Sequence, residues 1–376
     1  MYADYAAATP IDSRVLAAMQ PYFSEQFYNP SATYAAARQV RHDLEAARAD
    51  VAAVLGARPA ELIFTAGGTE ANNLAIHGVM RTFPGKKVVV SAIEHESVLA
   101  AARVYPCAEA PVMPDGLLDV ARLERTIDDN TVLVCIMYAN NEVGTIQQIR
   151  EVAALVHRIA DGRKKAGNTL PLYLHTDAAQ AANYLDLHVS RLGVDLMTLN
   201  GGKIYGPKQS GALWVKTGVH LEPLVYGGGQ ERGLRSGTEN VAGAVGFSTA
   251  LQLAQEMRGD ESRRLQHLQE LCFGLMEQQL PDVIISGSRK KRLPNNVHIT
   301  VPGKDNERVL MQLDEAGIQA AAGSACSASS EDPSHVLRAM GVSSRDAQAS
   351  LRFTFGRATT EKDIRTLVDT LLRIVG

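Results

Sequence analysis

Apolar and polar residues alternate along the first two thirds of the chain in a way that predicts strands and helices in turn. Short apolar runs predict strands at residues 61–65, 87–93, 132–137, 172–177 and 194–199. Longer segments with apolar positions three or four residues apart, such as 32–55, predict helices. Because strands that alternate with helices form right-handed crossover units, we expect an α/β fold with a mostly parallel central sheet flanked by helices.

The last third of the chain predicts a smaller α+β domain. Helical patterns run over 240–257 and 262–280, and short strands then alternate with helices. We place the domain boundary where those two helical patterns meet. The large domain is then expected at residues 12–257, and the small one at 1–11 together with 258–376.

Composition and charge argue against nucleic acid and membranes as direct partners. The chain has 376 residues, enough for two cores, and its formal net charge of -3 gives no basic footprint for nucleic acid. No apolar run reaches the length of a membrane span, and the first residues lack the basic and apolar regions of a signal peptide. We therefore expect a cytoplasmic protein without a direct nucleic-acid or membrane partner.

The four cysteines lack CxxC spacing, so we expect neither a metal site nor a disulfide framework. Cys135 lies in an apolar strand pattern, Cys272 lies on an amphipathic helix, and Cys107 follows a proline. Cys326 is different, because serine, alanine and glycine surround it in residues 322–330 and such a setting exposes a sulfur. An ordinary thiol in a tight turn is the other interpretation.

A lysine behind two glycines is the most informative feature. Residues 195–208 read Asp-Leu-Met-Thr-Leu-Asn-Gly-Gly-Lys-Ile-Tyr-Gly-Pro-Lys, with Lys203 directly after Gly201 and Gly202. Glycines have no Cβ, so a flat molecule can lie close to the chain beside the lysine amine. A desolvated amine can form a Schiff base with an aldehyde such as pyridoxal phosphate, PLP. A surface lysine on a turn is the alternative.

Other predicted strands end in side chains that suit the same cofactor. Asp177 could keep the pyridine nitrogen of PLP protonated, so that the ring stabilises a carbanion, or it could cap a helix. His95 could stack on a planar ring and move protons, or it could cap a helix. Gly68 and Thr69 follow a glycine turn and open a helix, where unpaired amides bind phosphate esters.

Two polar loops complete the pattern. Asn140 and Asn141 follow the strand at 132–137 and could hydrogen-bond a phenolate or a carboxylate, or only cap the loop. Residues 226–239 form a glycine-rich, cationic loop. An anion or a neighbouring subunit would hold such a loop, through Arg235 or Thr238.

Seven short motifs occur in one order along the chain. They are Thr-Glu after a glycine turn, Glu-His, Asn-Asn-Glu-Val-Gly, His-Thr-Asp-Ala-Ala-Gln, Lys-Ile-Tyr-Gly-Pro-Lys, Glu-Arg-Gly-Leu-Arg-Ser-Gly-Thr and Gly-Ser-Ala-Cys. Together they resemble the cysteine desulfurases of the NifS and IscS type, class V members of the PLP-dependent fold type I superfamily. The resemblance spans nearly the whole chain. It implies a homodimer that uses PLP to convert L-cysteine to L-alanine and passes the sulfur, as a persulfide, to an acceptor protein for iron–sulfur cluster assembly or tRNA thiolation.

The resemblance also implies roles for single residues. Lys203 would hold PLP and move the Cα proton, Cys326 would be the nucleophile, and His95 would lie over the ring and relay protons. The other implied contacts are Asp177 with the pyridine nitrogen, Gln180 with the ring oxygen, Asn141 with that oxygen or the substrate, Gly68 and Thr69 with the phosphate, Thr238 with the phosphate held by the second subunit, and Arg352 with the substrate carboxylate.

The chain departs from the family pattern at residues 200–203, at Ala8, where a threonine is common, and at its end. Where the family usually has Ser-Gly-His-Lys, residues 200–203 read Asn-Gly-Gly-Lys, so both side chains that help to hold the phosphate are replaced. Asn200 could substitute and Gly202 cannot, so we expect weaker cofactor retention than is usual in the family. The chain also ends at Gly376 without the longer tail by which IscS-type enzymes dock their scaffold, so docking by that route is not expected.

Two other functions stay open. Another class V PLP enzyme, such as a selenocysteine lyase or an aminotransferase, would share most of the site, although an aminotransferase has no use for a thiol at Cys326. A weakly active or inactive scaffold that only binds partners would follow if the change at Gly202 has removed activity.

Overall fold

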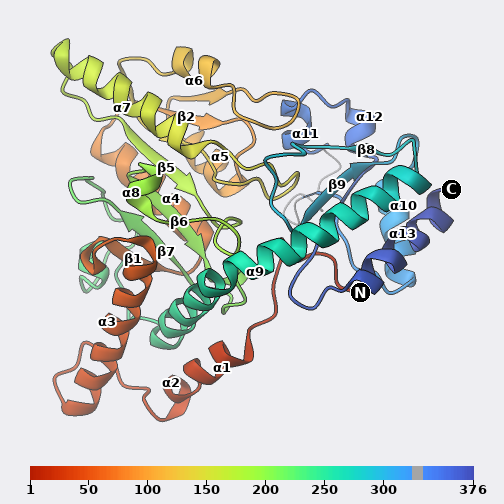
Figure 1. The fold of residues 1–376 in the computed structure, drawn as a ribbon. Helices are drawn as coiled ribbons and strands as arrows, with labels where there is room; N and C mark the ends of the chain where they lie inside the picture. Colours follow the sequence, from red (N-terminus) through yellow and green to blue (C-terminus); the bar gives the residue numbers. More distant parts are fainter. Residues whose placement is uncertain (324–332) are drawn as a thin grey trace.

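The computed structural model describes residues 1–323 and 333–376, which contain two sheets (Figure 1). The larger sheet has seven strands in the order β1-β7-β6-β5-β4-β2-β3. Its strands are β1 (Leu62–Thr65), β2 (Lys87–Ser91), β3 (Cys107–Ala110), β4 (Thr131–Cys135), β5 (Tyr173–Asp177), β6 (Leu196–Asn200) and β7 (Gly211–Val215). Only β7 runs antiparallel to its neighbours within this sheet, which confirms the prediction of a mostly parallel sheet.

Alternate residues of the central strands belong to two hydrophobic cores on opposite faces of this sheet. Val88 and Val90 of β2 belong to one core, whereas Val89 belongs to the other. The helices around the sheet are α1 (Ser13–Met19), α2 (Pro21–Ser24), α3 (Ala35–Leu55), α4 (Gly68–Thr82), α5 (Glu96–Ala102), α6 (Val120–Thr126), α7 (Ile149–Lys165) and α8 (Val189–Leu192). Burial on both faces explains why the strands are nearly uniformly apolar.

Local sequence signals set the start of α1 and the end of α3. Asp12 caps α1 by accepting a hydrogen bond from the Arg14 amide, and Gly56 ends α3 with a φ of 62°. An L side chain rarely adopts that backbone conformation, and a Cβ at Gly56 would also collide with His188.

The helix α9 (Val241–Gln279) is continuous over 39 residues and joins the two halves of the molecule (Figure 1). The expectation of two separate helices meeting near residues 258–261 is therefore wrong. The single Gly259 costs a helix only about 1 kcal/mol, and both arms of α9 bury apolar side chains, Leu251 in one core and Leu265 in another. Among the described residues no helix, α9 included, is long and apolar enough to cross a membrane.

The smaller sheet is antiparallel, in the order β10-β9-β8, and packs against the second arm of α9. Its strands and helices are β8 (Ile284–Ile285), β9 (Asn296–Thr300), β10 (Ser350–Thr354), α10 (Asn306–Glu315), α11 (His335–Ala339), α12 (Ser344–Ala347) and α13 (Glu361–Val375). The N-terminal segment joins this half through bridges from Tyr2 to Gln319 and from Asp4 to Thr354. The domain division at residues 257 and 258 stays a prediction.

Candidate active site

Most of the predicted site residues meet in one cleft. The carboxyl ends of the parallel strands lie at its edge, which is where open α/β sheets bind ligands. The predicted residues that line it are Gly68, Thr69, His95, Asn141, Asp177, Gln180, Asn200, Lys203 and Arg352. Thr238 lies elsewhere, and Cys326 falls outside the described residues.

Lys203 lies on a short 3-10 turn (Gly201–Lys203) directly after β6. Its Nζ donates hydrogen bonds to the carbonyl oxygens of Ala6 at 2.9 Å and Ala7 at 2.6 Å, so the N-terminal segment holds the amine at the cleft. A Cβ on Gly201 would lie 2.2 Å from Ser210 Oγ, so only glycine fits there. These carbonyl contacts were not foreseen, because nothing in the sequence around Ala6 marks it.

Gly202 differs from Gly201 in its surroundings. The nearest atom to a Cβ placed on Gly202 would be Asn200 Oδ1, at 3.5 Å, which is an ordinary van der Waals contact. The fold therefore does not require glycine at this position. The absence of a side chain at residue 202 is a property of this sequence and removes a potential phosphate ligand.

Asp177 ends β5 and is 6% exposed. Its Oδ1 accepts a hydrogen bond from the Ala179 amide at 2.9 Å, and its Oδ2 accepts one from Asn72 Nδ2 at 2.7 Å. Two donors fix the plane of the carboxylate, and its remaining lone pairs can accept a further donor such as a pyridinium N–H. Asn72 was not predicted as part of the site.

The start of α4 forms an anion-binding turn. Gly67 has a φ of 120°, which favours glycine, and the helix that follows begins at Gly68 and Thr69. Asn200 Oδ1 accepts a hydrogen bond from the Gly202 amide at 3.0 Å, which identifies the other amide atom as the donor Nδ2. That donor faces the turn, because a Cβ on Gly68 would lie 3.3 Å from it. Helix-start amides and a side-chain donor together suit a phosphate.

We expect Asn200→Ala to raise the dissociation constant of PLP about tenfold, because it removes one hydrogen bond to a charged group. Titration of the apoprotein followed by absorbance measures this constant. The matched control is Asn168→Ala, which removes a partly exposed amide that binds the Asp129 carbonyl and the Leu170 amide outside the cleft. Equal PLP affinity in Asn200→Ala and wild type would show that Asn200 does not hold the phosphate.

Arg352 of β10 brings a buried guanidinium to the cleft and is 1% exposed. Its Nη1 donates to the Asn141 carbonyl at 2.9 Å, and its Nη2 donates to Asp4 Oδ1 at 2.6 Å. These bonds fix the plane of the guanidinium, while each nitrogen carries a second N–H that can bind a substrate carboxylate. The pairing with Asp4 was not predicted, since the two residues lie at opposite ends of the chain.

Glu94, directly before His95, is fully buried, and its Oε1 accepts a hydrogen bond from the Met137 amide at 2.6 Å. Burial raises the pKa of this carboxyl well above its usual value. A raised pKa in the folded state means that stability present at low pH is lost as the pH rises toward that pKa. We expect Glu94→Gln to escape this loss, so that its advantage in Tm over wild type grows from about pH 5 to about pH 9.

Thermal unfolding of both proteins across that pH range measures the difference. Glu96→Gln is the control, because Glu96 is exposed on the same helix start. A pH-independent difference in Tm between Glu94→Gln and wild type would contradict the raised pKa.

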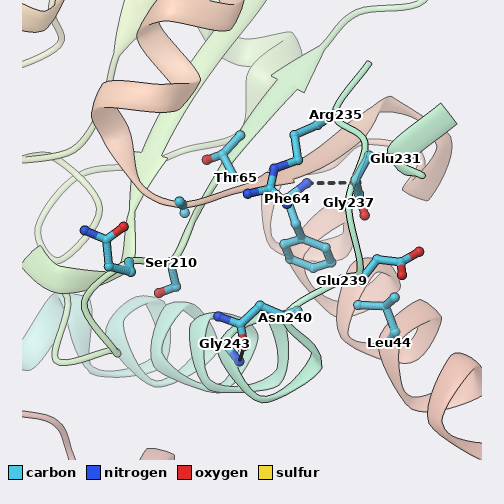
Figure 2. Close-up of a pocket in the computed structure, with 14 residues that line it drawn as sticks. Leu44, Phe64, Thr65, Ser210, Glu231, Arg235, Gly237, Glu239, Asn240 and Gly243 are labelled. Carbon is cyan, nitrogen blue, oxygen red and sulfur yellow. Dashed lines mark hydrogen bonds between the residues drawn. The ribbon is translucent and has the colours of Figure 1, made fainter. Parts of the chain in front are cut away.

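Thr238 is exposed, and its neighbours Gly237 and Glu239 line a second pocket. Figure 2 shows this pocket with Arg235, Gly237 and Glu239 where the glycine-rich loop passes along its edge. Arg235 Nε donates to Glu70 Oε1 at 2.9 Å, so it binds α4 of its own chain. Within one chain, Thr238 therefore does not line the cleft that holds Lys203.

The cleft contains the amine of Lys203, which can bind an aldehyde, and the carboxylate of Asp177, which can pair with a ring nitrogen. The start of α4 at Gly68 can bind a phosphate. The residues present thus fit PLP, and the sheet order with a second α+β half is the architecture of PLP enzymes of fold type I.

Comparisons with known proteins define the family. Residues 1–367 match aminotransferase class V, and the chain belongs to this family. The cysteine desulfurase IscS of Dictyoglomus turgidum is 39% identical over 100% of this chain and 94% of its own length. A solved NifS-like protein superposes with a TM-score of 0.90 at 31% identity, covering 100% of this chain and 98% of its own. SspA in complex with cysteine gives 0.80 at 33% identity, covering 94% and 98%. The chain is a PLP-dependent enzyme of the cysteine desulfurase group.

Proposed function

We propose that this enzyme transfers the sulfur atom of L-cysteine to Cys326 and releases L-alanine. The observation that carries the proposal is the cleft in which Lys203 from the turn after β6, Asp177 of β5 and Arg352 of β10 come together. The relationship to cysteine desulfurases over the full chain supports the same reaction.

PLP supplies a protonated pyridine ring that accepts the electron pair left on the substrate Cα. With PLP bound, Lys203 would hold the cofactor aldehyde and move the Cα proton of the substrate. Asp177 would balance the charge of the ring nitrogen, and His95 would contact the ring. The proposed phosphate ligands are Gly68, Thr69 and Asn200, and the proposed ligands of the ring oxygen are Gln180 and Asn141.

The substrate carboxylate pairs with Arg352, whose orientation is set by Asp4 and by the Asn141 carbonyl. The Cys326 thiolate attacks the substrate sulfur, forming an S–S bond while the bond between that sulfur and Cβ breaks. The electron pair of the broken bond stays on Cβ, which takes up a proton to give L-alanine. Cys326 is left as a persulfide, whose outer sulfur can pass to another thiolate.

The proposal includes a homodimer in which Thr238 of one copy joins the phosphate ligands of the other. Two observations support it, since Thr238 is exposed and lies outside the cleft of its own chain. A mixture of two variants tests it, one carrying Lys203→Ala and the other Thr238→Ala, at a PLP concentration that supports the activity of wild type but not that of Thr238→Ala. If Thr238 acts across the interface, mixed dimers contain one site with both residues intact and are active at that concentration. A mixture no more active than Thr238→Ala alone would contradict the shared site.

A sulfur-acceptor protein is the remaining proposed partner, either a scaffold for iron–sulfur clusters or a relay for tRNA thiolation. A persulfide is reactive and must be handed on, which requires a thiol or metal-bearing acceptor. The cytoplasm is the proposed compartment, because a nucleophilic thiol needs reducing surroundings.

Incubation of the purified holoprotein with L-cysteine and a reductant tests the function. We expect alanine and sulfide in equal amounts. Release of a keto acid without sulfide would identify an aminotransferase instead, and turnover of L-selenocysteine alone would identify a selenocysteine lyase. A protein that takes up no PLP would be the inactive scaffold.

A further inference from the structure

A chain of hydrogen bonds links Asp177 to His95 through two side chains that have no role in the mechanism above. Asn72 Nδ2 lies 2.7 Å from Asp177 Oδ2 and 2.8 Å from Ser97 Oγ. Ser97 Oγ lies 2.8 Å from His95 Nδ1, and the Ser97 amide donates to the same nitrogen at 3.1 Å. We propose that Asn72 and Ser97 are positioning residues that hold the ring proton of His95 on Nε2.

The carboxylate at one end sets the direction of every bond in this chain. An ionised Asp177 can only accept, so the nitrogen of the Asn72 amide must face it. The second hydrogen on that nitrogen then points to Ser97 Oγ, which becomes an acceptor on that side. The single hydroxyl proton of Ser97 is left for His95, so Nδ1 must accept it.

The backbone amide of Ser97 favours the same form. The Ser97 amide is a donor in every protonation state, and it caps the start of α5 by donating to His95 Nδ1. A proton on Nδ1 would oppose two donors at once and would remove this cap. Asn72 is 1% exposed, so water cannot readily replace its hydrogen bonds to Asp177 and Ser97.

A neutral His95 held in this form presents an N–H donor at Nε2 and has no free lone pair on that nitrogen. It can stabilise an atom that gains negative charge by donating a hydrogen bond to it, but it cannot remove a proton through Nε2. Proton removal from Cα then falls to Lys203 alone. The tautomer follows from the contacts of this chain, whereas the identity of the atom that receives the hydrogen bond rests on the proposed function.

Nitrogen-15 NMR on histidine-labelled protein reads the tautomer directly, at about pH 8, where an ordinary histidine is neutral. His95→Asn assigns the signal, and spectra are recorded on the apoprotein and on the holoprotein. We expect a single tautomer with the proton on Nε2. In Asn72→Asp a new carboxylate accepts the Ser97 hydroxyl proton, so we expect the Nδ1–H form to become populated.

Ser97→Ala provides the matched control. It removes the hydroxyl link and keeps the backbone amide, so the Nε2–H form should persist, and adding Asn72→Asp to it should change nothing. A wild-type protein with its proton on Nδ1 overturns the proposal, as does an Asn72→Asp protein with an unchanged tautomer. The wild-type spectrum alone shows which ring nitrogen of His95 carries the proton, even if a variant fails to fold. Because the signal does not depend on turnover, absence of desulfurase activity would count against the proposed function and not against the tautomer.

Discussion

Lys203→Ala is expected to give a colourless protein whose formation of alanine from L-cysteine falls by about 10³-fold or more. The variant loses both the amine that joins the cofactor covalently and the base that moves the Cα proton. The two carbonyls that bind Lys203 Nζ, those of Ala6 and Ala7, stay at the edge of the cleft. Absorbance in the visible range and release of alanine measure the two losses separately.

Lys216→Ala is the control for this prediction. Lys216 is half exposed and forms an ion pair at 2.9 Å with Asp195, the residue directly before β6. Its loss should leave both colour and rate near those of wild type. If Lys203→Ala kept the visible absorbance of lysine-bound PLP, another lysine would hold the cofactor and the assignment would be wrong.

Cys326→Ser is expected to keep the cofactor and its spectral response to L-cysteine, while alanine formation falls by about 10³-fold or more. The described cysteines cannot replace the missing thiol. Cys135 and Cys272 are fully buried, and burial raises the pKa of Cys135 well above its usual value and that of Cys272 to about 12. Thiols with such pKa values stay protonated near neutral pH and are poor nucleophiles.

Cys107→Ser provides the comparison, because Cys107 is half-buried on the edge strand β3 and burial also raises the pKa of its thiol. This variant should retain full activity. Rapid alanine formation by Cys326→Ser would mean that sulfur leaves the substrate without a protein thiol at that position. A selenocysteine lyase or an aminotransferase would then be the better description.

Most of the site residues that could be predicted from the sequence lie at the ends of strands. Lys203, Asp177 and His95 each follow a short apolar run, and parallel strands bring such ends to one edge regardless of their distance along the chain. Gly68 and Thr69 were predicted for a related reason, since a glycine turn before a helix leaves amides unpaired. Local chemistry and strand direction were sufficient in these cases.

Contacts between distant segments could not be predicted in the same way. Asn72 lies on the inner face of α4, where the pattern indicates only a helix, and its bond to Asp177 depends on how α4 packs on β5. The pairing of Asp4 with Arg352 joins the N-terminal segment to a strand near the other end of the chain. The continuity of α9 likewise depends on two cores that support its arms. The role of Cys326 stays a prediction, because it lies outside the described residues.

Transfer of isotopically heavy sulfur from L-cysteine to the protein tests the central claim most directly. The holoprotein is mixed with one equivalent of labelled L-cysteine without reductant, digested, and analysed by mass spectrometry. We expect one heavy sulfur atom on the peptide that contains Cys326, together with one equivalent of alanine. Alanine formed without labelled sulfur on Cys326, or label found only on other cysteines, would contradict it.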